Sequence, residues 1–213
     1  MRRALHALVA VALAALFAAC GNDAPRFAPL PPGAAVLAFG DSVTWGTGAA
    51  EGHDYPTRLA QRTGWQIANA GVPGDLAQTA RTRIDAELAT HTPQLVLIEI
   101  GGNDFLRRRG HDEVAADVRA IVHRVRAAGA IPVLIAVPAF SPLGAATGTL
   151  RDAGFYREIA EEERVPLIDE VFADVLSTPA LRTDPVHPNA EGYRRLADGI
   201  AAGLSRHGLL EGQ

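Results

Sequence analysis

The stretch AAVLAFGDSVTWG, residues 34–46, decides the fold class of this chain. Its first half is an unbroken apolar run that ends at Gly40, which predicts a strand over Ala34–Phe39. Such continuous runs are buried on both faces, as in a parallel sheet that is covered by helices. The second half turns polar at Asp41 and Ser42, so the strand is expected to end at a polar loop.

Four further apolar runs alternate with amphipathic segments along the chain. The expected strands cover residues 65–70, 94–100, 131–137 and 165–168. The expected helices cover residues 55–62, a segment that opens at Gly74-Asp75, and residues 114–128 and 190–204. This alternation favours a three-layer α/β fold, which places functional side chains at the carboxyl ends of its strands.

The N-terminal segment has the charge and hydropathy pattern of an export signal. Arg2 and Arg3 precede the almost wholly apolar run Ala4–Ala19, which is short for a membrane-spanning helix. Cys20, the only cysteine, follows at once. The segment Phe17-Ala18-Ala19-Cys20 resembles the lipobox of bacterial lipoproteins, whose cysteine is lipidated after cleavage before it. The alternative is an ordinary signal peptide with an incidental cysteine.

The lipobox resemblance implies a signal peptide over residues 1–19 and a membrane anchor at Cys20. Gly21 stands where an aspartate would resemble an inner-membrane retention signal, so we expect the outer membrane, on its periplasmic face. The proline-rich residues 20–33 are expected to form an extended tether. A single domain over residues 34–208 would follow.

Composition excludes several other chemistries. The formal net charge of −4 provides no basic surface for nucleic acid. All 20 basic residues are arginines, which excludes a Ser-Lys dyad, a lysine Schiff base and the usual lysine-containing phosphate loop. With Cys20 assigned to lipid, thiol catalysis is excluded as well. We expect no cofactor, no metal and a monomer.

Four polar blocks stand beside the expected strands and the last helix. They read FGDSVTWG, NAGVPGD, IEIGGND and DPVHPN. Each block alone is weak evidence for catalysis, since glycine followed by Asp-Ser often marks only a turn. Together, over about residues 34–204, they resemble the SGNH hydrolases, also called GDSL esterases or lipases. The resemblance implies a flavodoxin-like α/β/α sandwich with a five-stranded parallel sheet, and we interpret Val43, where the GDSL name expects leucine, as a packing change.

The family signature falls on Ser42, Gly71, Asn103 and His187. A serine nucleophile needs an adjacent base, and the imidazole of His187 titrates near working pH. On a turn, Asp184 can reach the other ring nitrogen. The resemblance implies an oxyanion hole built from the backbone N–H groups of Ser42 and Gly71 and the side chain of Asn103. Alternatively, Asp184 caps the last helix, and Gly71 and Asn103 serve only turns.

Two aspartates flank these residues. The resemblance suggests that Asp41 and Asp104 hold the loops through backbone hydrogen bonds. A metal site formed by these aspartates and His187 is disfavoured, because only one histidine is placed for it. His53, in the loop after the first block, is a weaker candidate for the cleft.

Within the family, the nearest resemblance is to bacterial lysophospholipase/thioesterase and arylesterase enzymes. It implies hydrolysis of lipid or small-molecule carboxyl esters or thioesters, and carboxyl esters or lysolipids suit an exported enzyme better than acyl-CoA. Phe105, Phe140 and Leu143 are candidates for an acyl groove, and Arg107 for an anionic head group. The alternatives are packing at the core edge and a solvated surface. Residues 144–148 are expected to be flexible and to serve as a lid.

Two other functions compete with this interpretation. The same family includes carbohydrate O-acetylesterases, and a binding module could retain the fold without catalysis. The intact set of signature residues argues against the binding module. An α/β-hydrolase is disfavoured, because no Gly-x-Ser-x-Gly elbow occurs in the sequence.

Overall fold

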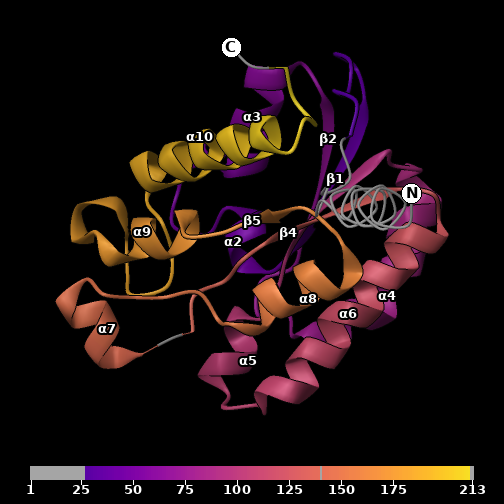
Figure 1. The fold of residues 1–213 in the computed structure, drawn as a ribbon. Helices are drawn as coiled ribbons and strands as arrows, with labels where there is room; N and C mark the ends of the chain where they lie inside the picture. The colour runs from indigo at the N-terminus through magenta and orange to yellow at the C-terminus, as the bar shows by residue number, and fades with distance from the viewer. Residues whose placement is uncertain (1–26, 140, 212–213) are drawn as a thin grey trace, which may run out of the picture.

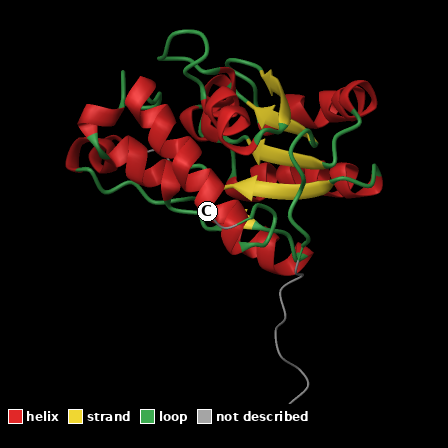
Figure 2. Ribbon diagram, turned by 90° about the horizontal axis from the view of Figure 1, so that it is seen from above, coloured by secondary structure: helices red, strands yellow, loops and turns green. Residues whose placement is uncertain are grey.

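The computed structural model describes residues 27–139 and 141–211. Its centre is a parallel sheet of five strands in the order β2-β1-β3-β4-β5. The strands are β1 (Ala35–Gly40), β2 (Gln66–Gly71), β3 (Leu95–Glu99), β4 (Ile131–Ile135) and β5 (Leu167–Ile168). Every pair of neighbouring strands is parallel, and Figure 2 shows the sheet from above with helices beside it. The predicted five-stranded parallel sheet is confirmed, with strand ends shifted by one to two residues.

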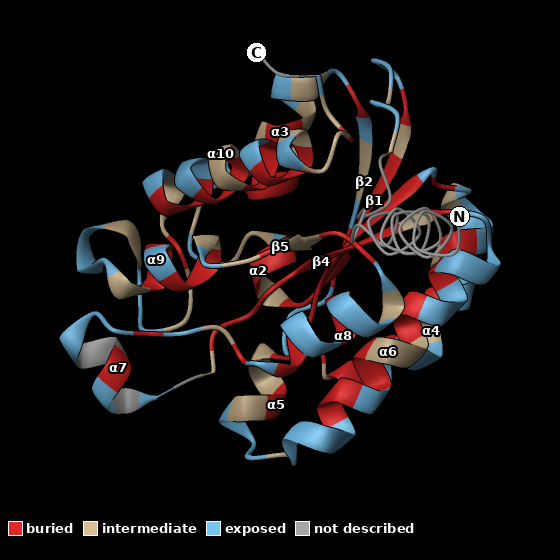
Figure 3. Ribbon diagram, in the orientation of Figure 1, coloured by how far each residue is buried: buried red, intermediate tan, exposed pale blue. Residues whose placement is uncertain are grey.

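Helices cover both faces of the sheet (Figure 1). One layer contains α3 (Tyr55–Thr63) and α10 (Ala190–Arg206), and the other contains α4 (Ala77–His91), α6 (His111–Ala127) and α8 (Phe155–Glu163). The strands β1, β3 and β4 are buried between them, whereas much of the edge strand β2 and the outer helix faces are exposed or partly exposed (Figure 3). The apolar runs of the sequence thus form the core, and the three-layer fold is confirmed.

Several short helices were not predicted from the sequence. They are α2 (Ser42–Trp45), α5 (Gly102–Leu106), α7 (Pro142–Thr147), α9 (Val171–Ser177) and the 3₁₀ turn η1 (Pro179–Leu181). The longer α8 was missed too, although Phe155 and Ile159 recur at helical spacing on its buried side. The missed helices include the two that begin at the functional loops.

Residues 144–148, for which the sequence predicts flexibility, contribute to a short helix. These residues lie in and directly after α7, which is well formed at both ends. The Ser141 side chain accepts the backbone N–H of Gly144 at 3.2 Å, which caps the start of the helix. Gly148 ends it in the left-handed conformation, with φ of 68°. A role as a lid stays a prediction.

Residues 27–33, the last part of the predicted tether, are described by the structure. From Phe27 onward the chain packs against the fold, because Phe27 and Leu30 bury part of their apolar surface against the core. The N–H of Leu30 donates to the carbonyl of Leu209 at 3.0 Å, and the N–H of Gly33 donates to the carbonyl of Gly64 at 2.8 Å. The signal peptide and Cys20 lie outside the described residues. No helix within the described part is long and apolar enough to cross a membrane.

The strand order brings two functional loops together. β1 and β3 are neighbours in the sheet, and Gly40 pairs with Glu99 at their carboxyl ends. Parallel α/β sheets bind ligands at the point where the strand order reverses, since the chain leaves two adjacent strands in opposite directions. The helices α2 and α5 begin at this point, and they carry Ser42 and Asn103.

Candidate active site

Ser42 is the first residue of α2, directly after β1. The Asp41 side chain accepts the backbone N–H of Val43 at 3.0 Å and so caps this short helix. Position 40 requires glycine, because a Cβ at Gly40 would lie 2.2 Å from the carbonyl oxygen of Glu99. The close approach of β1 and β3 therefore determines where the helix begins and where Ser42 lies.

His187 meets Ser42 across the carboxyl edge of the sheet. Its Nε2 atom lies 2.9 Å from Ser42 Oγ, and its Nδ1 atom lies 2.8 Å from Asp184 Oδ2. The second Asp184 oxygen accepts the backbone N–H groups of Val186 and His187 at 2.8 and 2.9 Å. The cap of α10 is Asn189 and not Asp184. Hydroxyl, imidazole and carboxylate thus form one hydrogen-bonded line.

The carboxylate of Asp184 favours its ionised form. Partial burial raises its pKa, but hydrogen bonds from the His187 ring and the Val186 N–H outweigh burial, so the pKa lies below its usual value. An ionised Asp184 favours the tautomer that carries its proton on His187 Nδ1. Nε2 is then free to accept the proton of a serine hydroxyl.

The loop that carries His187 is tied to the loop after α2. The Thr183 backbone N–H donates to the His187 carbonyl at 2.9 Å, and the Thr183 hydroxyl donates to the Gly48 carbonyl at 2.9 Å. The Tyr193 hydroxyl donates to the Thr47 carbonyl at 2.8 Å. These bonds hold the imidazole against the serine without using either of the two side chains.

Asn103 lines the same cavity as Ser42 and His187. Its side-chain nitrogen donates to Asp41 Oδ2 at 3.1 Å and to the backbone carbonyl of Asp75 at 3.0 Å. The two acceptors hold the amide beside the serine. The structure therefore brings together three of the four signature residues at one cavity.

Gly71, the fourth signature residue, has a packing role of its own. A Cβ at this position would lie 2.2 Å from the backbone nitrogen of Trp45 and 2.8 Å from the carbonyl oxygen of Asp41. Its N–H donates to Asn69 Oδ1 at 3.0 Å, and Gly71 is not among the residues that line the cavity. Its part in an oxyanion hole stays a prediction.

The flanking aspartates make the backbone contacts expected of them. Asp41 caps α2, and burial raises its pKa to about 6. Asp104 accepts the backbone N–H of Ala77 at 2.9 Å and a guanidinium N–H of Arg109 at 2.5 Å. Within the described part of the chain, no group of three acidic, histidine or cysteine side chains is arranged to hold a metal ion.

Arg83, on α4, is a positioning residue that the sequence analysis missed. Its guanidinium donates to the Gly40 carbonyl at 2.8 Å, the Ala70 carbonyl at 2.9 Å and the Asp75 carboxylate at 2.8 Å. It therefore ties the carboxyl ends of β1 and β2 to the start of α4. The one available signal was an arginine three positions after Ala80, on the apolar side of a predicted helix.

The triad opens on a cavity of about 520 Å³, counting the space that is open to solvent. Most of its wall is apolar. The apolar lining residues are Val43, Leu106, Val137, Pro138, Leu150, Phe172, Leu176 and Val186. They come from α2, α5, α9 and three connecting segments, so no continuous sequence motif marks them. An acyl chain is the chemical group that such a wall accommodates best.

Phe105 does not line this cavity, contrary to the prediction. Its ring packs 5.4 Å from the ring of His111 and 6.1 Å from that of Phe155. Leu106, the next residue on α5, lines the cavity instead. Consecutive helix residues point about 100° apart, so a shift of one position exchanges the core side for the cavity side.

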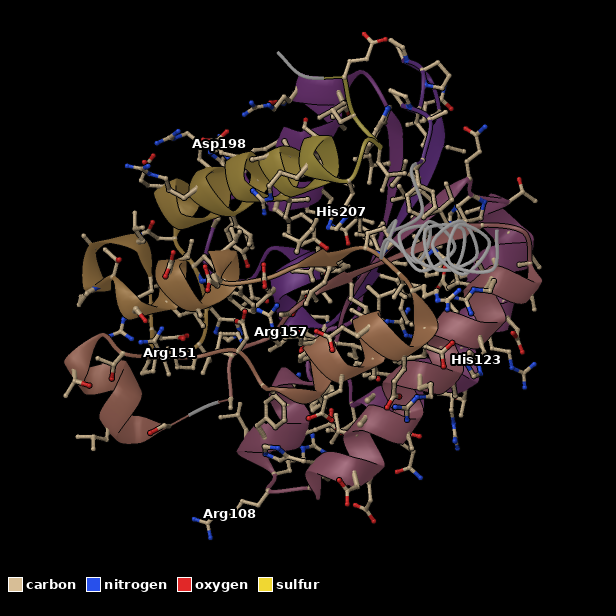
Figure 4. The ribbon with its side chains drawn as sticks, in the orientation of Figure 1. Arg108, His123, Arg151, Arg157, Asp198 and His207 are labelled. Atoms are coloured by element: carbon tan, nitrogen blue, oxygen red, sulfur yellow. The ribbon has the colours of Figure 1, made fainter. Side chains whose placement is uncertain are left out.

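The other predicted substrate contacts also lie away from the cavity. Arg107 is exposed and Leu143 is 72% exposed, and neither lines the wall. The neighbouring Arg108 extends from the ribbon into solvent (Figure 4). His53 is exposed and also stands outside the wall. Phe140 lies outside the described residues.

Comparisons with known proteins show which family the chain resembles. Residues 38–195 match the GDSL-like Lipase/Acylhydrolase family. The chain is 31% identical to "Thioesterase 1/protease 1/lysophospholipase L1" of Escherichia coli (strain K12), over 79% of this chain and 82% of that protein. It is 25% identical to an arylesterase of Vibrio mimicus, over 81% of this chain and 88% of that protein.

Solved structures share the fold. The esterase AlinE4, described as an SGNH-hydrolase family member, matches with a TM-score of 0.63 and 27% identity, over 83% of this chain and 97% of that chain. A crystal structure of TesA matches with a TM-score of 0.72 and 24% identity, over 81% of this chain and 98% of that chain. From the family match over most of its length, the chain belongs to the GDSL-like lipase/acylhydrolase family, the SGNH hydrolases.

Proposed function

We propose that this protein is a serine esterase that hydrolyses carboxyl esters or thioesters through an acyl-enzyme. The observation that carries the proposal is the hydrogen-bonded line from Ser42 through His187 to Asp184, with spacings of 2.9 and 2.8 Å. The names of its relatives, a thioesterase/lysophospholipase and an arylesterase, support the same reaction class.

In the first half of the reaction, Ser42 Oγ attacks the carbonyl carbon of the substrate while His187 Nε2 takes the hydroxyl proton. The carbonyl oxygen gains negative charge, which we assign to the backbone N–H of Ser42 and the side-chain amide of Asn103, with Gly71 as a third predicted donor. His187 then returns the proton to the leaving alcohol or thiol. The acyl group remains bound to Ser42.

In the second half, a water molecule attacks the acyl-enzyme. His187 Nε2 removes a proton from the water and later gives it to Ser42 Oγ, so the carboxylic acid leaves and the enzyme returns to its starting state. Asp184 keeps its charge throughout and stabilises the imidazolium that forms in each half. The proton transfers of both halves therefore go through His187, which already lies in hydrogen-bond contact with Ser42 and Asp184.

The apolar wall favours acyl chains longer than acetyl. Eight apolar residues line the cavity beside Ser42, and each methylene buried there contributes about 0.8 kcal/mol. A carbohydrate O-acetylesterase, the alternative, would gain nothing from this wall. We therefore place the acyl group against Leu106, Leu150 and Leu176.

A series of p-nitrophenyl esters from acetyl to decanoyl tests the substrate class, beside acyl-CoA and lysophosphatidylcholine and with Ser42→Ala as the blank. We expect kcat/KM to rise beyond acetyl and Leu106→Ala to weaken that rise. Activity confined to acetyl would favour the O-acetylesterase.

A phosphonofluoridate probe tests the nucleophile. We expect one adduct on a Ser42 peptide, no adduct in Ser42→Ala and slow labelling in His187→Ala. No labelling of the folded wild-type protein would favour the binding module.

We further propose that the protein is exported and carries lipid at Cys20. The support is the sequence that precedes the described residues, together with the place where the chain enters the fold. Phe27 lies beside Gly208, just beyond the last turn of α10. The first turn of this helix follows the His187 loop about 25 Å away, so the described chain begins at the end of α10 that is remote from the cavity. Radiolabelled palmitate tests the modification, and incorporation that persists in Cys20→Ala would contradict it.

A further inference from the structure

Glu99 is a fully buried acid that the mechanism above does not use. It ends β3, is 0% exposed and is one of the residues that line the cavity. Its Oε2 accepts the hydroxyl of Thr44 at 2.8 Å, whereas its Oε1 has no hydrogen-bond partner in the described part of the chain. A buried polar atom without a partner is costly, so its retention calls for a reason.

The hydrogen bond from Thr44 links Glu99 to α2, the helix that begins at Ser42. Thr44 belongs to α2, two positions after Ser42, and is itself fully buried. Its hydroxyl also lies 3.0 Å from the Tyr55 hydroxyl, and its carbonyl accepts the side-chain N–H of Asn69 at 2.8 Å. Because the Thr44 proton goes to Glu99, Tyr55 is the donor in the other bond. α2 is thereby joined to β3, α3 and β2.

The surroundings of Glu99 favour its neutral form. Burial and then the negative charge of Asp41 raise the pKa of Glu99 well above its ordinary value, and hydrogen bonds from Thr44 offset this only in part. The other titratable groups near it are Tyr55, Tyr156 and Tyr193, whose own pKa values are raised chiefly by burial. The described residues form no ion pair with Glu99 within 4.0 Å. An ionised carboxylate here would be buried without a cationic partner among the described residues.

We propose that Glu99 is a positioning residue that works as a neutral acid: by accepting the Thr44 hydroxyl, it holds α2 so that Ser42 stays in line with His187. The inference rests on the proposed function, because it concerns the placement of the same nucleophile. It assigns no proton transfer to Glu99. A misplacement of the serine by about 1 Å would be enough to cost roughly 100-fold in rate.

The test compares Glu99→Gln, Glu99→Ala and Thr44→Val in the full-length protein. Glutamine keeps a neutral oxygen that can accept the Thr44 hydroxyl. We therefore expect kcat within about threefold of wild type, a change no larger than a weakened hydrogen bond would cause. Alanine and valine each remove the contact, and we expect kcat to fall about 100-fold with KM changed less than about threefold. The double variant Glu99→Ala/Thr44→Val should be no slower than either single variant.

Three outcomes would overturn the proposal. They are Glu99→Gln as slow as Glu99→Ala, additive losses in the double variant, or folded Glu99→Ala with wild-type kcat. If Glu99→Ala does not fold, Thr44→Val decides, because valine has nearly the same shape and removes only the hydroxyl. Wild-type kcat in that variant would then reject the proposal.

The protonation state has a separate readout. The infrared spectrum of the wild-type protein near neutral pH should show a protonated carboxyl band that Glu99→Gln removes, and its absence would contradict the neutral acid. Failure of the proposed function is distinguishable, because it would appear as wild-type protein without hydrolysis or labelling at Ser42.

Discussion

The nucleophile and its base are held in two different ways. Ser42 begins a helix whose Thr44 is fully buried and bonds to the buried Glu99. Asp184, in contrast, is 46% exposed at its side chain, and it accepts hydrogen bonds from its chain neighbours Val186 and His187. The core therefore positions the serine, whereas a local turn orients the imidazole. Changes on the core side should affect stability and turnover, and changes on the loop side turnover alone.

Among residues that only support the nucleophile and its base, the largest effect is expected on the loop side. Asp184→Asn should lower kcat by about 10⁴-fold, because an amide favours the wrong imidazole tautomer. The melting temperature should stay within about 2 °C of wild type, since less than about 1 kcal/mol of stability is at stake at an exposed position. Ester hydrolysis and a thermal melt measure the two quantities.

A matched control is available on α10. Asp198 has a similar exposure of 42% and pairs with Arg62 and Arg194 on the surface (Figure 4 labels Asp198). Asp198→Asn should leave kcat unchanged. A large fall in melting temperature in Asp184→Asn but not in Asp198→Asn would show that the turn is part of the stable core. It would contradict the view that a local turn orients His187 independently of the core.

Asn103 stands between the two regions, because its amide bonds to the core carboxylate of Asp41 while it lines the cavity. Asn103→Ala should lower kcat by about 100- to 1,000-fold, the usual loss for one oxyanion donor, without unfolding the protein. An unchanged rate would remove Asn103 from the oxyanion hole.

On the core side, a stability difference that grows as pH rises is expected. The raised pKa of Glu99 means that the folded state holds a proton that the unfolded chain releases above about pH 4.3. Stability is therefore present at low pH and lost as pH rises. Glutamine does not titrate, so the melting temperature of Glu99→Gln minus that of wild type should grow from pH 4.5 to pH 8.

Each kcal/mol of that difference corresponds to about 2–4 °C in melting temperature for a domain of this size. Asp41, whose pKa burial raises to about 6, remains in both proteins, so its contribution largely cancels in the difference. A difference that is flat across this pH range would show that Glu99 ionises as easily as an exposed acid.

The smallest effect is expected at the exposed end of α5. Arg107 lies outside the cavity wall, so Arg107→Ala should change kcat/KM for neutral esters by less than about twofold, as surface substitutions usually do. A larger loss for lysophosphatidylcholine than for p-nitrophenyl esters would restore the predicted head-group contact.

The sequence was sufficient for the sheet and for the residues of the triad. Continuous apolar runs mark buried parallel strands, and the resemblance of the four polar blocks to the SGNH hydrolases indicated Ser42, His187 and, three residues before it, Asp184. Contacts between residues that are far apart in the sequence could not be predicted from it. Nothing in IEIGGND indicates that Glu99 bonds to Thr44, since the contact depends on how β1 and β3 are paired.

The residues that line the cavity could not be predicted from the sequence either. Phe105 and Leu106 are adjacent apolar residues, and only the orientation of the short α5 decides which one faces the substrate. A helix of five residues has too little periodicity for a sequence pattern to settle that orientation. Arg83 was missed for a related reason, because its three acceptors belong to β1, β2 and the segment before α4.

The central claim is that Ser42 and His187, separated by 145 positions, work as one unit. The most direct measurement compares ester hydrolysis by Ser42→Ala, His187→Ala and the double variant. Members of a catalytic unit are strongly non-additive, so each single change should lower kcat by roughly 10⁶-fold and the double variant should be no slower. Losses that multiply in the double variant, or a single variant with near wild-type turnover, would contradict the account.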